Sequence, residues 1–151
     1  MTTRQHGAQG VLRWRSDHER RLQLLRWILG FGILSTGLHF THNFVAIDQY
    51  PDDLVGGTAV RVAIVLFWPL FTAAALYAYR LYAQGRARDA HPFLLAYSFF
   101  ALTTLGHFLD GSPDIAPFWF ATIFTDALAG LALLAFTIAS MLSRPAGGAA
   151  N

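Results

Sequence analysis

The stretch WILGFGILSTGLHFTHNFVAI, residues 27–47, contains no charged side chain. At 1.5 Å per residue, a helix over this stretch is long enough to cross a hydrocarbon core of about 30 Å. His39, His42 and Asn43 interrupt the stretch at helical spacing. Because water is absent inside a bilayer, such polar groups need partners from the rest of the chain. The stretch therefore predicts a membrane span with a polar site on one face.

The composition of the whole chain is typical of a membrane protein. Hydrophobic residues make up 54% of the 151 residues and charged residues 13%, whereas a soluble domain carries about a quarter charged residues. The mean hydropathy is +0.40. All 11 basic residues are arginine, and neither lysine nor cysteine is present. Schiff-base chemistry, disulfides, thiolate metal sites and thioether-linked haem are therefore excluded.

Apolar segments predict four spans at about residues 24–47, 58–80, 92–109 and 115–142. Pro69 lies in the middle of the second span, where it should free the carbonyl of Val65 and kink the helix. The sequence SDHE, residues 16–19, matches a capping box and predicts a helix start there, between flexible segments at residues 1–15 and 144–151. Short connections between the spans predict an all-α integral membrane protein, an antiparallel four-helix transmembrane bundle.

The distribution of arginine predicts how the bundle is oriented. Arginines gather in the N-terminal segment, the loop between spans two and three, and the C-terminus, and only Arg61 lies on the opposite side. The positive-inside rule therefore places both termini in the cytoplasm of a cell-membrane protein, with His91 facing water on the inner side. This distribution explains the pI near 9.4 without a nucleic-acid partner. The expected partners are the lipid bilayer and, through small residues such as Gly130, a second copy of the chain or a larger membrane complex.

The ionisable residues of the spans fall in the half of the bundle that is predicted to face outward. Thr103, His107 and Asp110 follow i, i+4, i+7 spacing in the third span, and Thr122 and Asp126 share a face of the fourth. Each isolated charge at mid-membrane costs about 2.5–3.5 kcal/mol on insertion scales, so convergence would offset the cost. We predict one polar cavity open toward the outside, lined by His39, His42, His107, Asp126 and Arg61.

Imidazole and carboxylate groups without thiolate suit a divalent metal ion such as zinc, iron or copper. The metal ligands predicted from the sequence are His39, His42, His107 and Asp126. The residues predicted to bind a ligand or to support those side chains are Asn43, Arg61, Thr103, Asp110 and Thr122. No H-E-x-x-H or E-x-x-H pair occurs, and the spacing H-x-x-H is common in proteins of many kinds.

Other interpretations fit the same residues. The cluster could fix helix packing in a non-enzymatic accessory or structural subunit, in which an Arg61–Asp126 ion pair sets the helix register. A b-type haem, less favoured than a metal ion, could take one of His39 and His42 opposite His107. A lipid-like molecule could bind with histidine and aspartate as an acid–base pair. No catalytic residue is identified.

Overall fold

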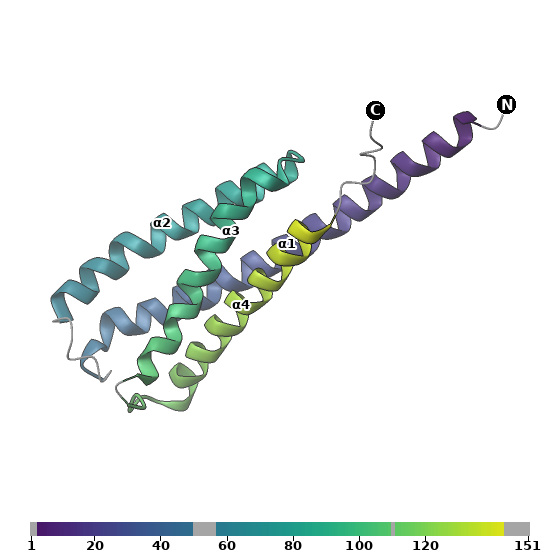
Figure 1. The fold of residues 1–151 in the computed structure, drawn as a ribbon. Coiled ribbons are helices and arrows are strands. Elements are labelled where there is room, and N and C mark those ends of the chain that lie inside the picture. The colour runs from purple at the N-terminus through teal and green to yellow at the C-terminus, as the bar shows by residue number, and fades with distance from the viewer. Residues whose placement is uncertain (1–2, 50–56, 110, 144–151) are drawn as a thin grey trace.

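The computed structural model describes residues 3–49, 57–109 and 111–143, with side chains from residue 16 onward except at Asp48. Every regular element in these ranges is helical, and none is a strand. The elements are α1 (Thr3–Val45), η1 (Ile47–Gln49), α2 (Gly57–Ala83), α3 (Ala87–Leu102), η2 (Thr103–Phe108) and α4 (Pro117–Leu142), where η denotes a 3-10 helix. Figure 1 shows the four α-helices, with α1 extending well past the others at its N-terminal end. The all-helical prediction is confirmed.

The four α-helices pack in a ring, in which α1 and α3 each contact both α2 and α4. The end of α1 meets the start of α2, where Arg61 Nε donates to the Phe44 carbonyl at 2.9 Å. The start of α3 meets the ends of α2 and α4, where Ser140 Oγ lies 3.1 Å from His91 Nε2 and 3.2 Å from Tyr82 Oη. We call this second end of the bundle the Ser140 end, and the opposite one the His107 end.

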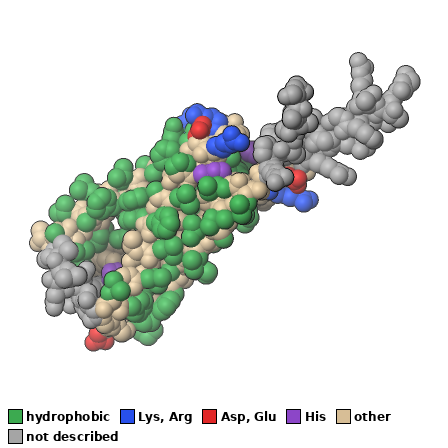
Figure 2. All heavy atoms as spheres, in the orientation of Figure 1, with side chains coloured by type: hydrophobic (Ala, Val, Ile, Leu, Met, Phe, Trp, Pro, Cys, Tyr) green, Lys and Arg blue, Asp and Glu red, His purple; other side chains and the backbone are tan. Residues whose placement is uncertain are grey.

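Over its second half, α1 turns apolar side chains outward and polar side chains inward. Its exposed apolar side chains recur every three or four residues, at Leu24, Trp27, Phe31, Leu34 and Leu38. Its buried polar side chains are Ser35, Thr36, His39, His42 and Asn43. A water-soluble helix has the reverse distribution. Figure 2 shows hydrophobic side chains along the flank of the bundle, as a lipid-facing surface requires.

Three helices are long and apolar enough to cross a membrane: Ser16–Val45, Thr58–Ala83 and Pro117–Leu142. Only 6% of the most apolar window of α2 is buried, so nearly all of this window lies on the surface of the bundle. These three helices coincide with the first, second and fourth predicted spans. The predicted third span, residues 92–109, is divided between α3 and η2.

The first helix starts at Thr3, so the helix start predicted at residues 16–19 is wrong. Those four residues lie inside α1, where a capping box has no free backbone N–H groups to satisfy. Once a helix is nucleated in a packed region, each added residue forms a further backbone hydrogen bond, and residues 3–15 contain no proline to stop it. The polar character of this segment is compatible with a helix that continues beyond the bundle.

The second helix runs through Pro69 and ends in a Schellman motif. The Arg86 N–H donates to the Leu81 carbonyl, and the Gly85 N–H to the Tyr82 carbonyl, each at 3.0 Å. Gly85 has φ 77°, a left-handed conformation that glycine adopts without a steric penalty. This tight turn brings α3 back along α2.

Helix α4 approaches α3 closely at Gly130. A Cβ atom on this residue would lie 3.0 Å from the Ser98 carbonyl oxygen and 3.1 Å from both Ala101 Cβ and Leu102 Cγ. The backbone of α3 cannot give way as a flexible side chain would. Gly130, which the sequence marked for helix association, is therefore used within the bundle.

We expect Gly130→Ala to destabilise the fold by about 1–3 kcal/mol, because the added methyl group overpacks the α3–α4 contact. The matched control is Gly30→Ala on the exposed face of α1, where no atom lies within 4 Å of a built Cβ. The control should be neutral or stabilising by up to about 1 kcal/mol, the helix-propensity difference. Equilibrium unfolding in mixed detergent–SDS micelles measures both. Equal effects of the two substitutions would contradict the packing described here.

Candidate functional site

His39 lies at the centre of a hydrogen-bonded cluster formed by α1, η2 and α4. Its side chain is completely buried. Its Nε2 lies 2.9 Å from Thr104 Oγ1 and 3.2 Å from Asn43 Nδ2, and its Nδ1 lies 3.4 Å from Thr122 Oγ1. We call His39, Asn43, Thr104, His107 and Thr122 the His39 cluster. The structure thus brings together four residues that the sequence assigned to one site, with Thr104 as an addition.

The side chain of Asn43 connects two imidazoles. Its Nδ2 lies 3.1 Å from His107 Nε2 as well as 3.2 Å from His39 Nε2. Because an amide nitrogen only donates, both Nε2 atoms act as acceptors, and both rings are then neutral with their protons on Nδ1. The two rings meet edge to face, with centroids 5.2 Å apart. The Asn43 amide therefore holds the two histidines in one tautomer and in contact.

Thr122 completes the hydrogen bonding of His39 on the α4 side. The Thr122 hydroxyl donates to the Trp119 carbonyl at 2.6 Å, which leaves its oxygen as an acceptor. An Nδ1–H on His39 can then donate to it across the 3.4 Å contact. This agrees with the tautomer that the orientation of Asn43 requires, so the cluster is internally consistent.

Because the α-helix changes to a 3-10 helix at Thr103, the threonine hydroxyl that is buried beside His39 belongs to Thr104 and not to Thr103. On a continuous α-helix, Thr103, His107 and Asp110 would share one face, but η2 makes three residues per turn instead of 3.6. Thr103 is exposed and donates to the Phe100 carbonyl at 2.7 Å. Thr104 is the residue beside His39, so the predicted common face is wrong. Asp110 lies outside the described residues.

The remaining predicted site residues make other contacts, and His42 is close enough to His39 to interact with it electrostatically. His42 stacks on Trp119, with ring centroids 4.6 Å apart and an interplanar angle of 20°. Asp126, one helical turn beyond Thr122, is completely buried, and neither carboxyl oxygen has a hydrogen-bond partner. Arg61 donates to the Phe44 carbonyl instead. The predicted Arg61–Asp126 ion pair does not form.

A metal ion requires several lone pairs to converge at about 2.0–2.2 Å from one point. In the described part of the chain, no group of three or more His, Asp or Glu side chains meets that requirement. Asn43 Nδ2 occupies the position between the His39 and His107 Nε2 atoms, and the edge contact of the rings leaves no room for a porphyrin between them. This packing does not fit either group, and the metal ion and haem stay predictions from the sequence.

One buried polar contact was not expected from the sequence. His91, predicted to face water, is buried at the Ser140 end and lies 3.1 Å from Ser140 Oγ. His91 precedes the apolar run of its span, so hydropathy places it outside the bundle. The turn at Gly85 and the first residues of α3 instead carry its ring against α4.

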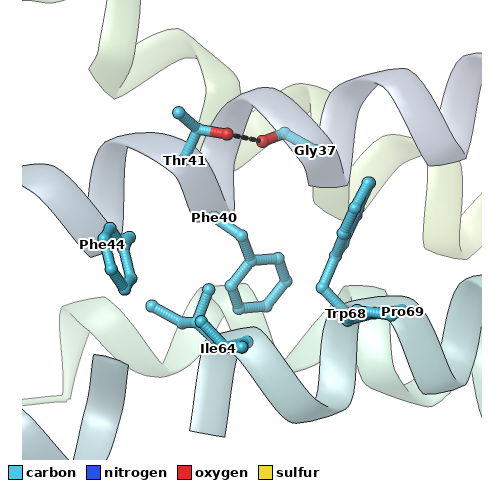
Figure 3. A pocket seen from close by; sticks show the side chains of 8 residues that line it. Gly37, Phe40, Thr41, Phe44, Ile64, Trp68 and Pro69 are labelled. Atoms are coloured by element: carbon cyan, nitrogen blue, oxygen red, sulfur yellow. Dashed lines mark hydrogen bonds between the residues drawn. The ribbon is translucent and has the colours of Figure 1, made fainter. Parts of the chain in front are cut away.

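A groove of about 310 Å³ lies between α1 and α2. Figure 3 shows Phe40 projecting from α1 toward α2, and Trp68 projecting from α2 toward Gly37. The indole Nε1 of Trp68 is buried without a hydrogen-bond partner. The Phe40 ring also meets the His39 ring edge to face, with centroids 5.6 Å apart. Phe40 is therefore a wall shared by the groove and the His39 cluster.

No protein-family model matches this chain, and no curated protein or solved structure matches it significantly. The fold and the site together define a small helical protein with membrane-like helices and a buried histidine cluster. What it binds must therefore be inferred from the geometry of the groove and the cluster.

We expect Thr104→Val to destabilise the protein by about 1 kcal/mol or more, because it removes the hydroxyl beside the buried His39 Nε2. The matched control is Thr103→Val, which changes the neighbouring, exposed residue with the same loss of a hydroxyl. Its effect should be smaller. Unfolding free energies in detergent measure both, and a larger loss for Thr103→Val would contradict the 3-10 register of η2.

Proposed function

We propose that the protein is a multi-pass membrane protein of four antiparallel spans that binds a small lipid-soluble molecule between α1 and α2. The observation that carries the proposal is the groove itself. Its apolar lining includes one buried N–H donor without a hydrogen-bond partner, Trp68 Nε1, and its Phe40 ring contacts the His39 imidazole. The His39 cluster fixes α1 in the orientation that presents Phe40 to the groove. Enzymatic activity is not part of this proposal.

The length of α3 and η2 supports the fourth span. At standard rises of 1.5 Å and 2.0 Å per residue, the two helices together extend over about 36 Å. That exceeds a hydrocarbon core of about 30 Å. Arg80, Arg86 and Arg88 lie at the Ser140 end, whereas Asp114 precedes α4 at the His107 end. The positive-inside rule then favours a cytoplasmic Ser140 end, with both termini on that side of the cell membrane.

Cysteine labelling tests this orientation, because the chain contains no cysteine of its own. We expect a membrane-impermeant maleimide to label Asp114→Cys in intact cells. Gln84→Cys, which is also exposed, should react only after the cells are permeabilised. Labelling of Gln84→Cys alone in intact cells would reverse the orientation, and labelling of both would contradict a spanning bundle.

The surroundings of the groove favour entry of the ligand from the bilayer. Phe44, Val65 and Phe67, in or beside the groove, are exposed on the flank of the bundle. In a membrane, this flank contacts lipid tails and not water. A volume of about 310 Å³ lies at the lower limit of small-molecule sites, which measure about 300–1,000 Å³. The groove therefore suits a short or partly inserted apolar molecule.

The unpartnered polar groups of the groove favour a ligand with one hydroxyl group. A buried N–H without a partner, such as Trp68 Nε1, costs about 1–3 kcal/mol. Pro69 lacks an N–H, so the carbonyl of Val65 loses its usual helical donor. A hydroxyl group accepts one hydrogen bond and donates another, which suits both groups. We therefore infer that the ligand is an apolar alcohol.

Fluorescence quenching by a dibrominated long-chain fatty alcohol tests the site. We expect saturable quenching that the unbrominated alcohol reverses and that Trp68→Phe abolishes, because Trp68 lies in the groove. The matched control is Trp27→Phe, which removes an exposed tryptophan elsewhere on α1. It should leave the saturable component intact. Quenching that does not saturate, or that persists in Trp68→Phe, would refute a specific site. Equal competition by a long-chain alkane would refute recognition of the hydroxyl.

A further inference from the structure

The side chain of Asp126 is a buried carboxyl group that the proposed ligand site does not use. It lies on α4 between Thr122 and Gly130 and is 0% exposed. Neither of its oxygens has a hydrogen-bond partner. An isolated carboxylate in an apolar interior carries a large desolvation cost unless a cation or several donors compensate it. The charged and hydrogen-bonding groups around Asp126 therefore determine whether its carboxyl group is ionised.

Among the described residues, no guanidinium forms an ion pair with Asp126, and Arg61 donates to the Phe44 carbonyl. The other described arginines lie in α1 no further along than Arg26, or at the Ser140 end. The ion pair within the described residues joins Arg86 and Asp89 on the surface. A carboxylate at Asp126 would have no counter-charge in the bundle.

The hydroxyl groups around Asp126 are already used by one another. Thr36 of α1 donates to the Gly32 carbonyl at 2.7 Å and lies 3.0 Å from Tyr97 Oη of α3, which can donate to it. Thr125 of α4 donates to the Thr122 carbonyl at 3.1 Å, and Ser35 Oγ lies 2.8 Å from Thr125 Oγ1. Each of these four hydroxyl groups therefore has an acceptor other than Asp126, in agreement with the missing partners of its carboxyl oxygens.

A proton on the carboxyl group removes the charge that nothing else compensates. We infer that Asp126 is a proton-binding site in the interior of the bundle, separate from the groove and from the His39 cluster. The reaction is uptake of one proton by the carboxylate to give a neutral carboxylic acid. A sodium ion is disfavoured, because it would need several oxygen ligands and the nearby hydroxyls are bound to one another.

The residues on either side of Asp126 indicate the side from which the proton arrives. Helix α4 packs against α1 and α3. Tyr97 of α3 interacts with Asp126 electrostatically, and His39 of α1 contacts Thr122, one turn from Asp126 toward the His107 end. Toward the Ser140 end, the core is closed by the apolar side chains Leu25, Leu29, Leu94 and Leu133. The polar route therefore runs through the His39 cluster.

Infrared spectroscopy of the full chain in lipid nanodiscs at pH 7 tests the inference. We expect a protonated-carboxyl C=O band that shifts in D₂O and is lost completely in Asp126→Asn. Asp126→Glu should retain a shifted band, which separates the assignment from a general failure to fold. The matched control is Asp114→Asn, an exposed aspartate whose removal should leave the band unchanged.

Three results would overturn the inference: absence of the band in the wild-type protein, its survival in Asp126→Asn, or its loss on addition of NaCl. The last result would identify a sodium site. The route is tested by His39→Gln, which should slow the shift of the band in D₂O, because the imidazole is removed and a hydrogen-bonding side chain is kept. An unchanged exchange rate would contradict entry through the His39 cluster.

Discussion

The side-chain amide of Asn43 determines how α1 faces the rest of the bundle. Its nitrogen contacts the imidazoles of His39 and His107, so rotating or sliding α1 would break its contact with His107 and the contact of the adjoining His39 with Thr104. The same orientation turns Thr36 toward Tyr97 and Phe40 toward the groove. One amide thereby couples the polar interior of the His107 end to the shape of the groove between α1 and α2.

The two halves of the bundle have different physical roles. Toward the Ser140 end, Leu25, Leu94 and Leu133 form a close-packed apolar core that stabilises the helices through burial and dispersion. Toward the His107 end, hydrogen bonds between helices replace much of that packing. Polar groups whose partners are incomplete, such as Asp126 and Asn43 Oδ1, occur in the second half. Buried polar groups that lack hydrogen-bond partners are expected at sites where a protein binds a ligand or a proton.

Hydropathy and helical spacing predicted the helices and the meeting of His39, Asn43, His107 and Thr122, because apolar length and depth in a membrane are properties of the sequence alone. They failed where tertiary packing decides local geometry. The 3-10 segment that places Thr104 instead of Thr103 beside His39 has no sequence signal, and neither does the lack of hydrogen-bond partners at Asp126. The groove depends on the directions in which the Phe40 and Trp68 side chains project. Hydrophobic periodicity cannot predict these directions for a helix that is apolar on both sides.

The Phe40 ring has a kinetic consequence. It stacks on Phe100 with centroids 5.2 Å apart, and Phe100 stacks in turn on Phe71 at 4.2 Å, so a column of three rings joins α1, α3 and α2. The Phe40 ring lies between the groove and the His39 imidazole, which it meets edge to face. Side-chain rotation is far faster than helix displacement, even when an aromatic stack must open first. A change in the Phe40 rotamer, with the helices stationary, would therefore be enough to change the contact between the groove and the buried imidazole.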